Sequence, residues 1–159
     1  MQIIEQLFQN KILVIAASSW LSAGVLKMII ELIINKKLVL ERIVGSGGMP
    51  SSHTATVVSL VISTAVIEGI GSAAFAISVI LAIIVIHDAM GVRLETGKQG
   101  QILNKMIWEL NLADELEVNE ALKEYVGHYP SQVIVGALVG TITSLCMLNA
   151  YGILWFKKN

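Results

Sequence analysis

Three short stretches of the sequence combine histidines with residues suited to holding an anion. They are GSGGMPSSHT at 45–54, HDAMGVR at 87–93 and GHYPSQ at 127–132. In the first stretch, glycines let the backbone approach a ligand, Pro50 suits the first turn of a helix, and Ser51 and Ser52 suit its cap. A helix that starts after such a loop offers free N–H groups and the positive end of its dipole to a phosphate. His53, in that first turn, is placed to exchange a proton with the phosphate.

Each stretch also has a purely structural interpretation. The first is typical of a loop and helix cap, His87 and Asp88 suit a hydrogen-bonded pair at a helix end, and His128 suits a loop. Arg93 and Lys98 suit solvated charges at a membrane surface. A metal site built from His53, His87, Asp88 and His128 is a further alternative, which we favour less because a glycine-rich helix start suits an anion better than a cation. We therefore expect no metal and no cofactor.

The composition excludes an ordinary soluble domain. Of the 159 residues, 55% are hydrophobic and 14% are charged, and the mean hydropathy is +0.73. Globular domains carry about 25% charged residues, so this chain needs an apolar solvent, and the lipid bilayer is the natural one. The net charge of −1 gives no basic field for nucleic acid. The single cysteine, Cys146, has no partner for an intramolecular disulfide.

Four apolar runs are long enough to suggest membrane spans, at about 12–34, 54–70, 72–90 and 133–156. The second is the weakest. We therefore predict an all-α fold, a polytopic membrane helical bundle that forms one domain. The polar loop 91–132 is predicted to hold two amphipathic helices with a break at 111–114. The apolar positions that indicate them are Ile102, Leu103, Met106, Ile107 and Leu110, then Leu116, Ala121, Leu122 and Tyr125.

With four spans, all three histidine stretches meet at one face of the membrane. The loops on that face hold Lys36, Lys37, Arg42, Arg93, Lys98, Lys105 and Lys123, against Lys11, Lys157 and Lys158 on the other. This excess of Lys and Arg predicts that the loops with the motifs are cytoplasmic, in a multi-pass protein of the cell membrane. Gly136 and Gly140 form a GxxxG pair, which suits either a homo-oligomer or a close contact within the chain.

The segments GGMPSSHTA, HDAMGVRLETGKQGQILN and LKEYVGHYPSQVIVGALVG resemble the divergent branch of the type 2 phosphatidic acid phosphatase family. The resemblance extends from about residue 20 to 140 and implies a membrane-embedded phosphatase that uses no metal. It implies that His128 attacks phosphorus to form a phosphohistidine and that His53 protonates the leaving group. The implied substrate is a lipid phosphate, either phosphatidate-like or a prenyl phosphate, with membrane lipids around the protein.

The same resemblance implies which residues bind the phosphate: Gly48, Ser51, Ser52, Lys27 and Arg93, with Arg42 as the alternative to Lys27. Asp88 would orient His128 or Arg93. The sequence departs from the family pattern at Ser52, where glycine is usual, and at Leu122, where arginine is usual. It also has Gln132 where an aspartate usually orients the nucleophilic histidine. A non-catalytic membrane protein that retains a phosphate or lipid headgroup site is therefore the alternative function.

Overall fold

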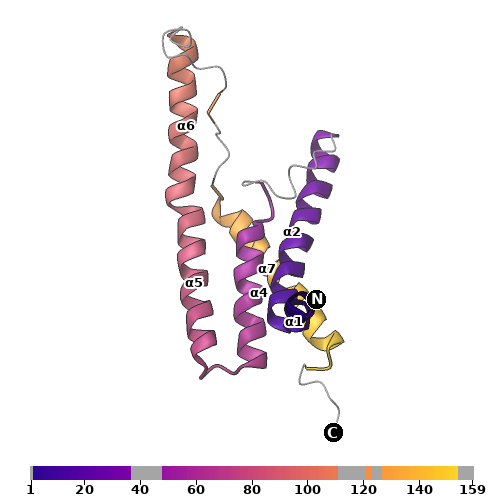
Figure 1. Ribbon diagram of the computed structural model, residues 1–159. Coiled ribbons are helices and arrows are strands. Elements are labelled where there is room, and N and C mark those ends of the chain that lie inside the picture. The colour runs from indigo at the N-terminus through magenta and orange to yellow at the C-terminus, as the bar shows by residue number, and fades with distance from the viewer. Residues whose placement is uncertain (1, 37–47, 111–120, 123–126, 154–159) are drawn as a thin grey trace.

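The computed structural model describes residues 2–36, 48–110, 121–122 and 127–153, and all regular secondary structure in these ranges is helical. Figure 1 shows the helices as a bundle of roughly parallel and antiparallel rods. Their bounds are α1 Gln2–Gln9, α2 Lys11–Asn35, α4 Ser52–Ile67, α5 Ala73–Met90, α6 Val92–Glu109 and α7 Pro130–Ala150. The prediction of an all-α bundle is confirmed.

The described helices have the length and composition of a membrane protein. Three apolar segments are long enough to cross a bilayer: Lys11–Asn35, Ala73–Glu109 and Pro130–Ala150. At 16 residues, α4 is shorter, and its length of about 24 Å falls below the roughly 30 Å of a hydrocarbon core. Large apolar side chains such as Ile77, Ile80 and Leu138 are exposed on the outer faces, where lipid covers a membrane bundle.

Helix α4 forms the centre of the bundle and packs against α2, α5 and α7. Small residues allow this packing to be close. A Cβ atom added to Gly136 would lie 2.5 Å from the backbone oxygen of Ser51, and one added to Gly140 would lie 2.5 Å from that of Ala55. The Ser19 hydroxyl also donates a hydrogen bond to the Ala55 oxygen at 3.0 Å. The GxxxG pair is thus used inside the chain, to bring α7 against α4.

The ends of the predicted spans agree with the helices to within a few residues, except at the last. Helix α4 ends at Ile67, before Gly69, whose φ of +86° suits glycine. Helix α7 ends at Ala150, followed by Gly152 with a φ of +67°. The predicted span extends to residue 156, and residues 154–156 lie outside the described part of the chain.

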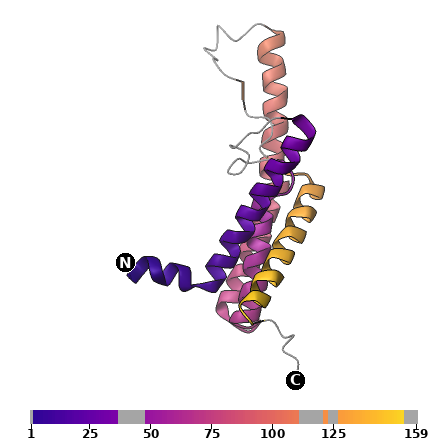
Figure 2. The same ribbon diagram turned by 90° about the vertical axis from the view of Figure 1, so that its right-hand side faces the viewer.

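The polar loop does not begin where the sequence suggested. We expected a loop from 91 and a helix from about 100, but α6 starts at Val92, directly after Gly91. Figures 1 and 2 show α5 and α6 as one long rod whose α6 part extends beyond the rest of the bundle. The first turns of α6 are stabilised by contacts within the helix, including the ion pair between Lys98 and Glu95 at 2.6 Å. Gly97 and Gly100 are among the buried residues of this helix.

The second predicted amphipathic helix is wrong at the two of its positions that the structure describes. Ala121 and Leu122 have no helical structure. Asn104 of α6 instead holds the backbone of Leu122 through two hydrogen bonds, donating to its oxygen at 2.9 Å and accepting from its N–H at 2.8 Å. Leu116 and Tyr125 lie outside the described residues.

Candidate functional site

Backbone contacts bring the three histidine stretches together at one end of the bundle. The N–H of His128 donates to the Ala89 oxygen at 2.9 Å, and the N–H of Ser51 donates to the Gln132 oxygen at 3.1 Å. A Cβ atom added to Gly127 would lie 2.2 Å from the backbone nitrogen of Leu94, so only glycine fits there. The segment before α7 is therefore held against the junction of α5 and α6.

A cavity of about 170 Å³ opens where these stretches meet. This is several times the roughly 30 Å³ that one water occupies in the liquid. The side chains around it come from four parts of the chain: His53, Ile84, Val85, Asp88, Ala89, Arg93 and His128. The rings of His53 and His128 have their centroids 6.3 Å apart. Two histidines and an acid–base pair thus share one small space at the end of an apolar bundle.

Hydrogen bonds at Gln132 define the tautomer of His128. The Gln132 Oε1 atom lies 3.2 Å from Nδ1 of His128 and 3.0 Å from the backbone nitrogen of Tyr129. The Tyr129 N–H can only donate, so the Gln132 atom that faces it is the carbonyl oxygen rather than the amide nitrogen. That oxygen can only accept, so Nδ1 of His128 carries the proton. Nε2 of His128 is then left with its lone pair.

His128 is a buried side chain with 2% exposure. Burial lowers the pKa of its imidazole below the ordinary value of 6.5, because the charged form loses water. The hydrogen bond to Gln132 raises the pKa, and the positive charge of Lys27 lowers it. His53 and Arg93 lower it further. The net result is a histidine that is neutral at pH 7.

Asp88 bonds to Arg93, which distinguishes between the two orienting roles considered for it. The distance from Arg93 Nε to Asp88 Oδ2 is 2.5 Å, and both side chains remain partly exposed. The acceptor at the His128 ring is Gln132 instead. Asp88 is therefore suited to aim the guanidinium of Arg93 rather than to polarise His128.

Lys27 is a lysine within an apolar helix, yet its residue is only 3% exposed. Gly48 covers its stem: a Cβ atom added to Gly48 would lie 3.4 Å from Cδ of Lys27. Gly48 also has a φ of +78°, which favours glycine. Because the charge of Lys27 acts on His128, the ammonium group is within electrostatic reach of the cavity. Arg42, the alternative to Lys27, lies outside the described residues.

The start of α4 matches the predicted cap. The Ser51 hydroxyl accepts a hydrogen bond from the N–H of Thr54 at 3.3 Å. Ser52 follows at the first helical position and is 4% exposed. Among the described residues, its Oγ is the buried side-chain atom that has no hydrogen-bond partner. A buried hydroxyl without a hydrogen-bond partner destabilises the folded protein, so the Ser52 hydroxyl is available to donate to an acceptor on a ligand.

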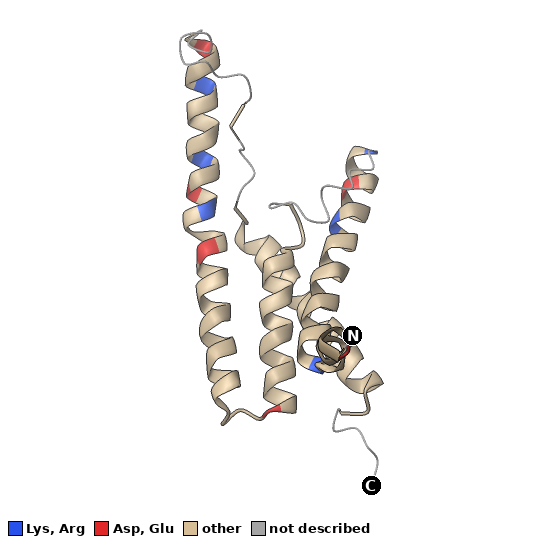
Figure 3. Cartoon of the chain, in the orientation of Figure 1, with Lys and Arg blue, Asp and Glu red and all other residues tan. Residues whose placement is uncertain are grey.

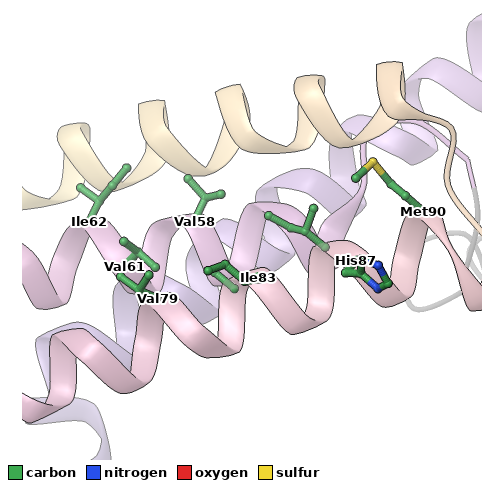
Figure 4. Close-up of a pocket in the computed structure, with 9 residues that line it drawn as sticks. Val58, Val61, Ile62, Val79, Ile83, His87 and Met90 are labelled. Atoms are coloured by element: carbon green, nitrogen blue, oxygen red, sulfur yellow. The ribbon is translucent and has the colours of Figure 1, made fainter.

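His87 does not join the other histidines. It lines a separate apolar groove of about 470 Å³ between α4 and α5, with Val58, Val61, Ile62, Val79, Ala82, Ile83, Ile86 and Met90. Figure 4 shows the His87 ring toward one end of this groove, near Met90, and Val61 and Ile62 of α4 toward the other end. Within the described ranges, no group of three or more His, Cys, Asp or Glu side chains could hold a metal ion. The alternative metal site on His53, His87, Asp88 and His128 therefore has no geometric support.

Two supporting contacts were not predicted from the sequence. The Ala89 carbonyl accepts from the N–H of His128, and Asn104 holds the backbone of Leu122. A backbone carbonyl has no sequence signal. Asn104 does carry a sequence signal, because an amide on the buried face of an amphipathic helix needs a hydrogen-bond partner.

The fold and this cavity define a helical membrane protein in which two histidines and an Asp–Arg pair gather at one end of the bundle. A family model described as the divergent PAP2 family matches residues 8–143. The protein belongs to this family, as the resemblance at the histidine stretches indicated. It is 35% identical over 152 residues to the uncharacterized membrane protein YuiD of Bacillus subtilis (strain 168), covering 89% of this chain and 96% of that protein. No solved structure matches the chain.

Proposed function

We propose that this protein is a membrane-embedded phosphatase that hydrolyses a lipid phosphate through a phosphohistidine, without a metal. The observation that supports it most strongly is the pair of histidine rings, 6.3 Å apart, at a cavity shared with the Asp88–Arg93 pair. A nucleophile and an acid on separate elements are what a two-step phosphoryl transfer requires. Membership of a phosphatase-related family supports the same reaction.

In the first step, Nε2 of neutral His128 attacks phosphorus and the bond to the leaving oxygen breaks. His53 gives its proton to that oxygen, so an alcohol departs. In the second step, His53 accepts a proton from water as the water attacks phosphorus, which releases phosphate and restores His128. The buried, neutral state of His128 suits the first step because only the unprotonated nitrogen is nucleophilic.

Cations and hydrogen-bond donors hold the phosphoryl oxygens in this proposal. Arg93, aimed by Asp88, and Lys27 offset the negative charge. The N–H groups at the start of α4 and the hydroxyl of Ser52 donate hydrogen bonds. Gly48 packs against the stem of Lys27, and Ser51 caps the helix. The apolar part of the cavity lining, Ile84, Val85 and Ala89, suits the hydrocarbon part of a phosphatidate-like or prenyl phosphate lipid.

A phosphate-release assay tests this function. The purified protein in detergent is given phosphatidate and a prenyl phosphate, with His53→Ala and His128→Ala as variants. His87→Ala is the matched control, because His87 lines the apolar groove instead of the cavity. We expect release by the wild type and by His87→Ala, and a loss of about 10²-fold or more in the other two. Equal rates in all four proteins, or no release at all, would refute catalysis.

Binding without turnover is the second candidate function, and the neutral Gln132 is the observation that favours it. An amide fixes the tautomer of His128 but gives no negative charge to stabilise its cationic, phosphorylated state. Equilibrium binding of phosphate or a lipid headgroup, lost in Arg93→Ala and accompanied by no release, would favour this function over hydrolysis.

The proposal treats the whole chain as one domain of the cell membrane with the cavity on the cytoplasmic side. Figure 3 shows the Lys and Arg residues of the described part concentrated at the end that carries α6. Cysteines can be placed singly at Lys105, 71% exposed, and at Ile70, 77% exposed, in a Cys146→Ser background. An impermeant thiol reagent on intact cells should label the cysteine at position 70 and spare that at 105. The reverse pattern would invert the orientation.

A further inference from the structure

Helix α1 (Gln2–Gln9) lies apart from the bundle. Among the described elements its contacts are with α2 alone, and none of its residues is buried. Figure 2 shows α1 projecting sideways from the N-terminal end of α2, away from the other helices and far from the end that carries α6. The break between the two helices is Asn10, whose side chain accepts from the N–H of Leu13 and caps α2.

The two faces of α1 differ sharply. Its apolar side chains are highly exposed: Ile3 75%, Ile4 62%, Leu7 52% and Phe8 76%. They recur at the spacing of one helical face, whereas Gln2, Glu5, Gln6 and Gln9 lie on the other. Four large apolar side chains in so short a helix would not remain in water, and none of the other described helices buries them, so we look for a cover beyond the described residues.

We propose that α1 lies in the membrane–water interface of the leaflet opposite the cavity, with this apolar face among the lipid acyl chains. Helix α2 begins at Lys11 and is long and apolar enough to span the bilayer, so the preceding residues are already at its boundary. At eight residues, or about 12 Å, α1 cannot cross the bilayer itself. A short helix with one apolar and one polar face, placed at that level, lies along the interface.

The polar face of α1 supports lipid as the partner. Gln6 and Gln9 line an open pocket with the polar residues Asn10, Lys11 and Glu68 and with Ile12 and Ile67. Charged side chains such as Lys11 and Glu68 mark the aqueous edge of a bilayer, so this side of α1 faces water and headgroups. The apolar half then faces the hydrocarbon that surrounds α2. This inference does not depend on the proposed phosphatase activity.

Spin labels on the full-length chain test it. Single cysteines replace Ile4, Leu7 or Gln6 in the Cys146→Ser background, and each labelled protein is reconstituted into phosphatidylethanolamine and phosphatidylglycerol vesicles. Collision with oxygen, which enters lipid, is compared with collision with a water-soluble nickel chelate. We expect the oxygen-to-nickel ratio at positions 4 and 7 to exceed that at position 6 several-fold.

Three results would overturn the proposal. Equal ratios at the three positions, all water-like, would leave the apolar face uncovered by lipid. Shielding of positions 4 and 7 from both reagents would indicate that protein covers them. Spin–spin broadening between labels at position 7 would identify a second copy of this chain as the partner. Matched melting temperatures of the three labelled proteins show that each remains folded.

Discussion

Nδ1 of His128 lies 3.2 Å from Oε1 of Gln132, which is in the first turn of α7. The same oxygen accepts the Tyr129 N–H at 3.0 Å, so it is held in place and requires His128 to carry its proton on Nδ1. Gln132 thus supplies one of the two effects that a carboxylate would have at this position. It sets the tautomer and orientation of the imidazole, but it does not stabilise the imidazolium by charge.

Gln132→Glu should raise the rate of phosphate release. The carboxylate keeps the hydrogen bond and adds the missing charge, so we expect roughly a tenfold gain, which corresponds to about 1.4 kcal/mol. Gln132→Leu removes the acceptor and should slow release roughly tenfold or more. Steady-state kinetics on a lipid phosphate measure both. Equal rates in the two variants would show that Gln132 does not act on the nucleophile.

The pH dependence of kcat/KM should reflect the buried state of His128. Burial lowers its pKa, so the neutral, nucleophilic form persists below the ordinary value of 6.5. On the acid side of the profile, activity should therefore be lost only as the pH falls below that value. In Gln132→Glu the carboxylate favours the imidazolium, which moves this loss to higher pH. A wild-type profile whose acid limb is centred above 6.5 contradicts the assignment.

Ser52→Ala should separate ligand binding from stability. The Ser52 hydroxyl is buried with no partner in the described structure, so its removal should not lower the melting temperature of the free protein. If the hydroxyl donates to a bound phosphoryl oxygen, the variant should bind phosphate more weakly, by about 1.5–3 kcal/mol. Ser63→Ala, in which a hydroxyl bonded to Ser59 is lost, is the matched control for burial. Unchanged phosphate affinity in Ser52→Ala would remove Ser52 from the site.

Gly136→Ala should destabilise the fold and the site together. The new Cβ atom would lie 2.5 Å from the Ser51 oxygen, so α7 and the start of α4 must move apart. Overpacking of this kind costs about 1–3 kcal/mol. Gly71→Ala is the control, because an added Cβ atom there has nothing within 4 Å. Thermal unfolding in detergent compares them. Equal melting temperatures would contradict the close packing of α4 and α7.

The sequence predicted those features that depend on composition and local pattern. The apolar runs gave the positions of α2, α4, α5 and α7, and the Gly-Pro-Ser pattern gave the start of α4. It also placed the histidine stretches at one end. It missed the early start of α6 because residues 92–101 are mostly polar and show no apolar periodicity, although they continue the rod formed by α5.

The partners within the site could not be read from spacing. Asp88 lies near both His128 and Arg93, and only the fold shows that it bonds to Arg93. His87 and Asp88 are adjacent in sequence but line different cavities, since neighbours on a helix point in different directions. The role of Asn104 depends on Leu122, which the sequence pattern assigned to a helix.

Trapping of the covalent intermediate tests the central claim most directly. The protein is mixed with a lipid whose phosphate is radiolabelled, quenched in base, and mapped by mass spectrometry, with His128→Ala and His87→Ala alongside. We predict a base-stable, acid-labile phosphoryl group on His128 in the wild type and in His87→Ala, and none in His128→Ala. Phosphate released with no labelled protein, or a label that persists in His128→Ala, would contradict the phosphohistidine mechanism.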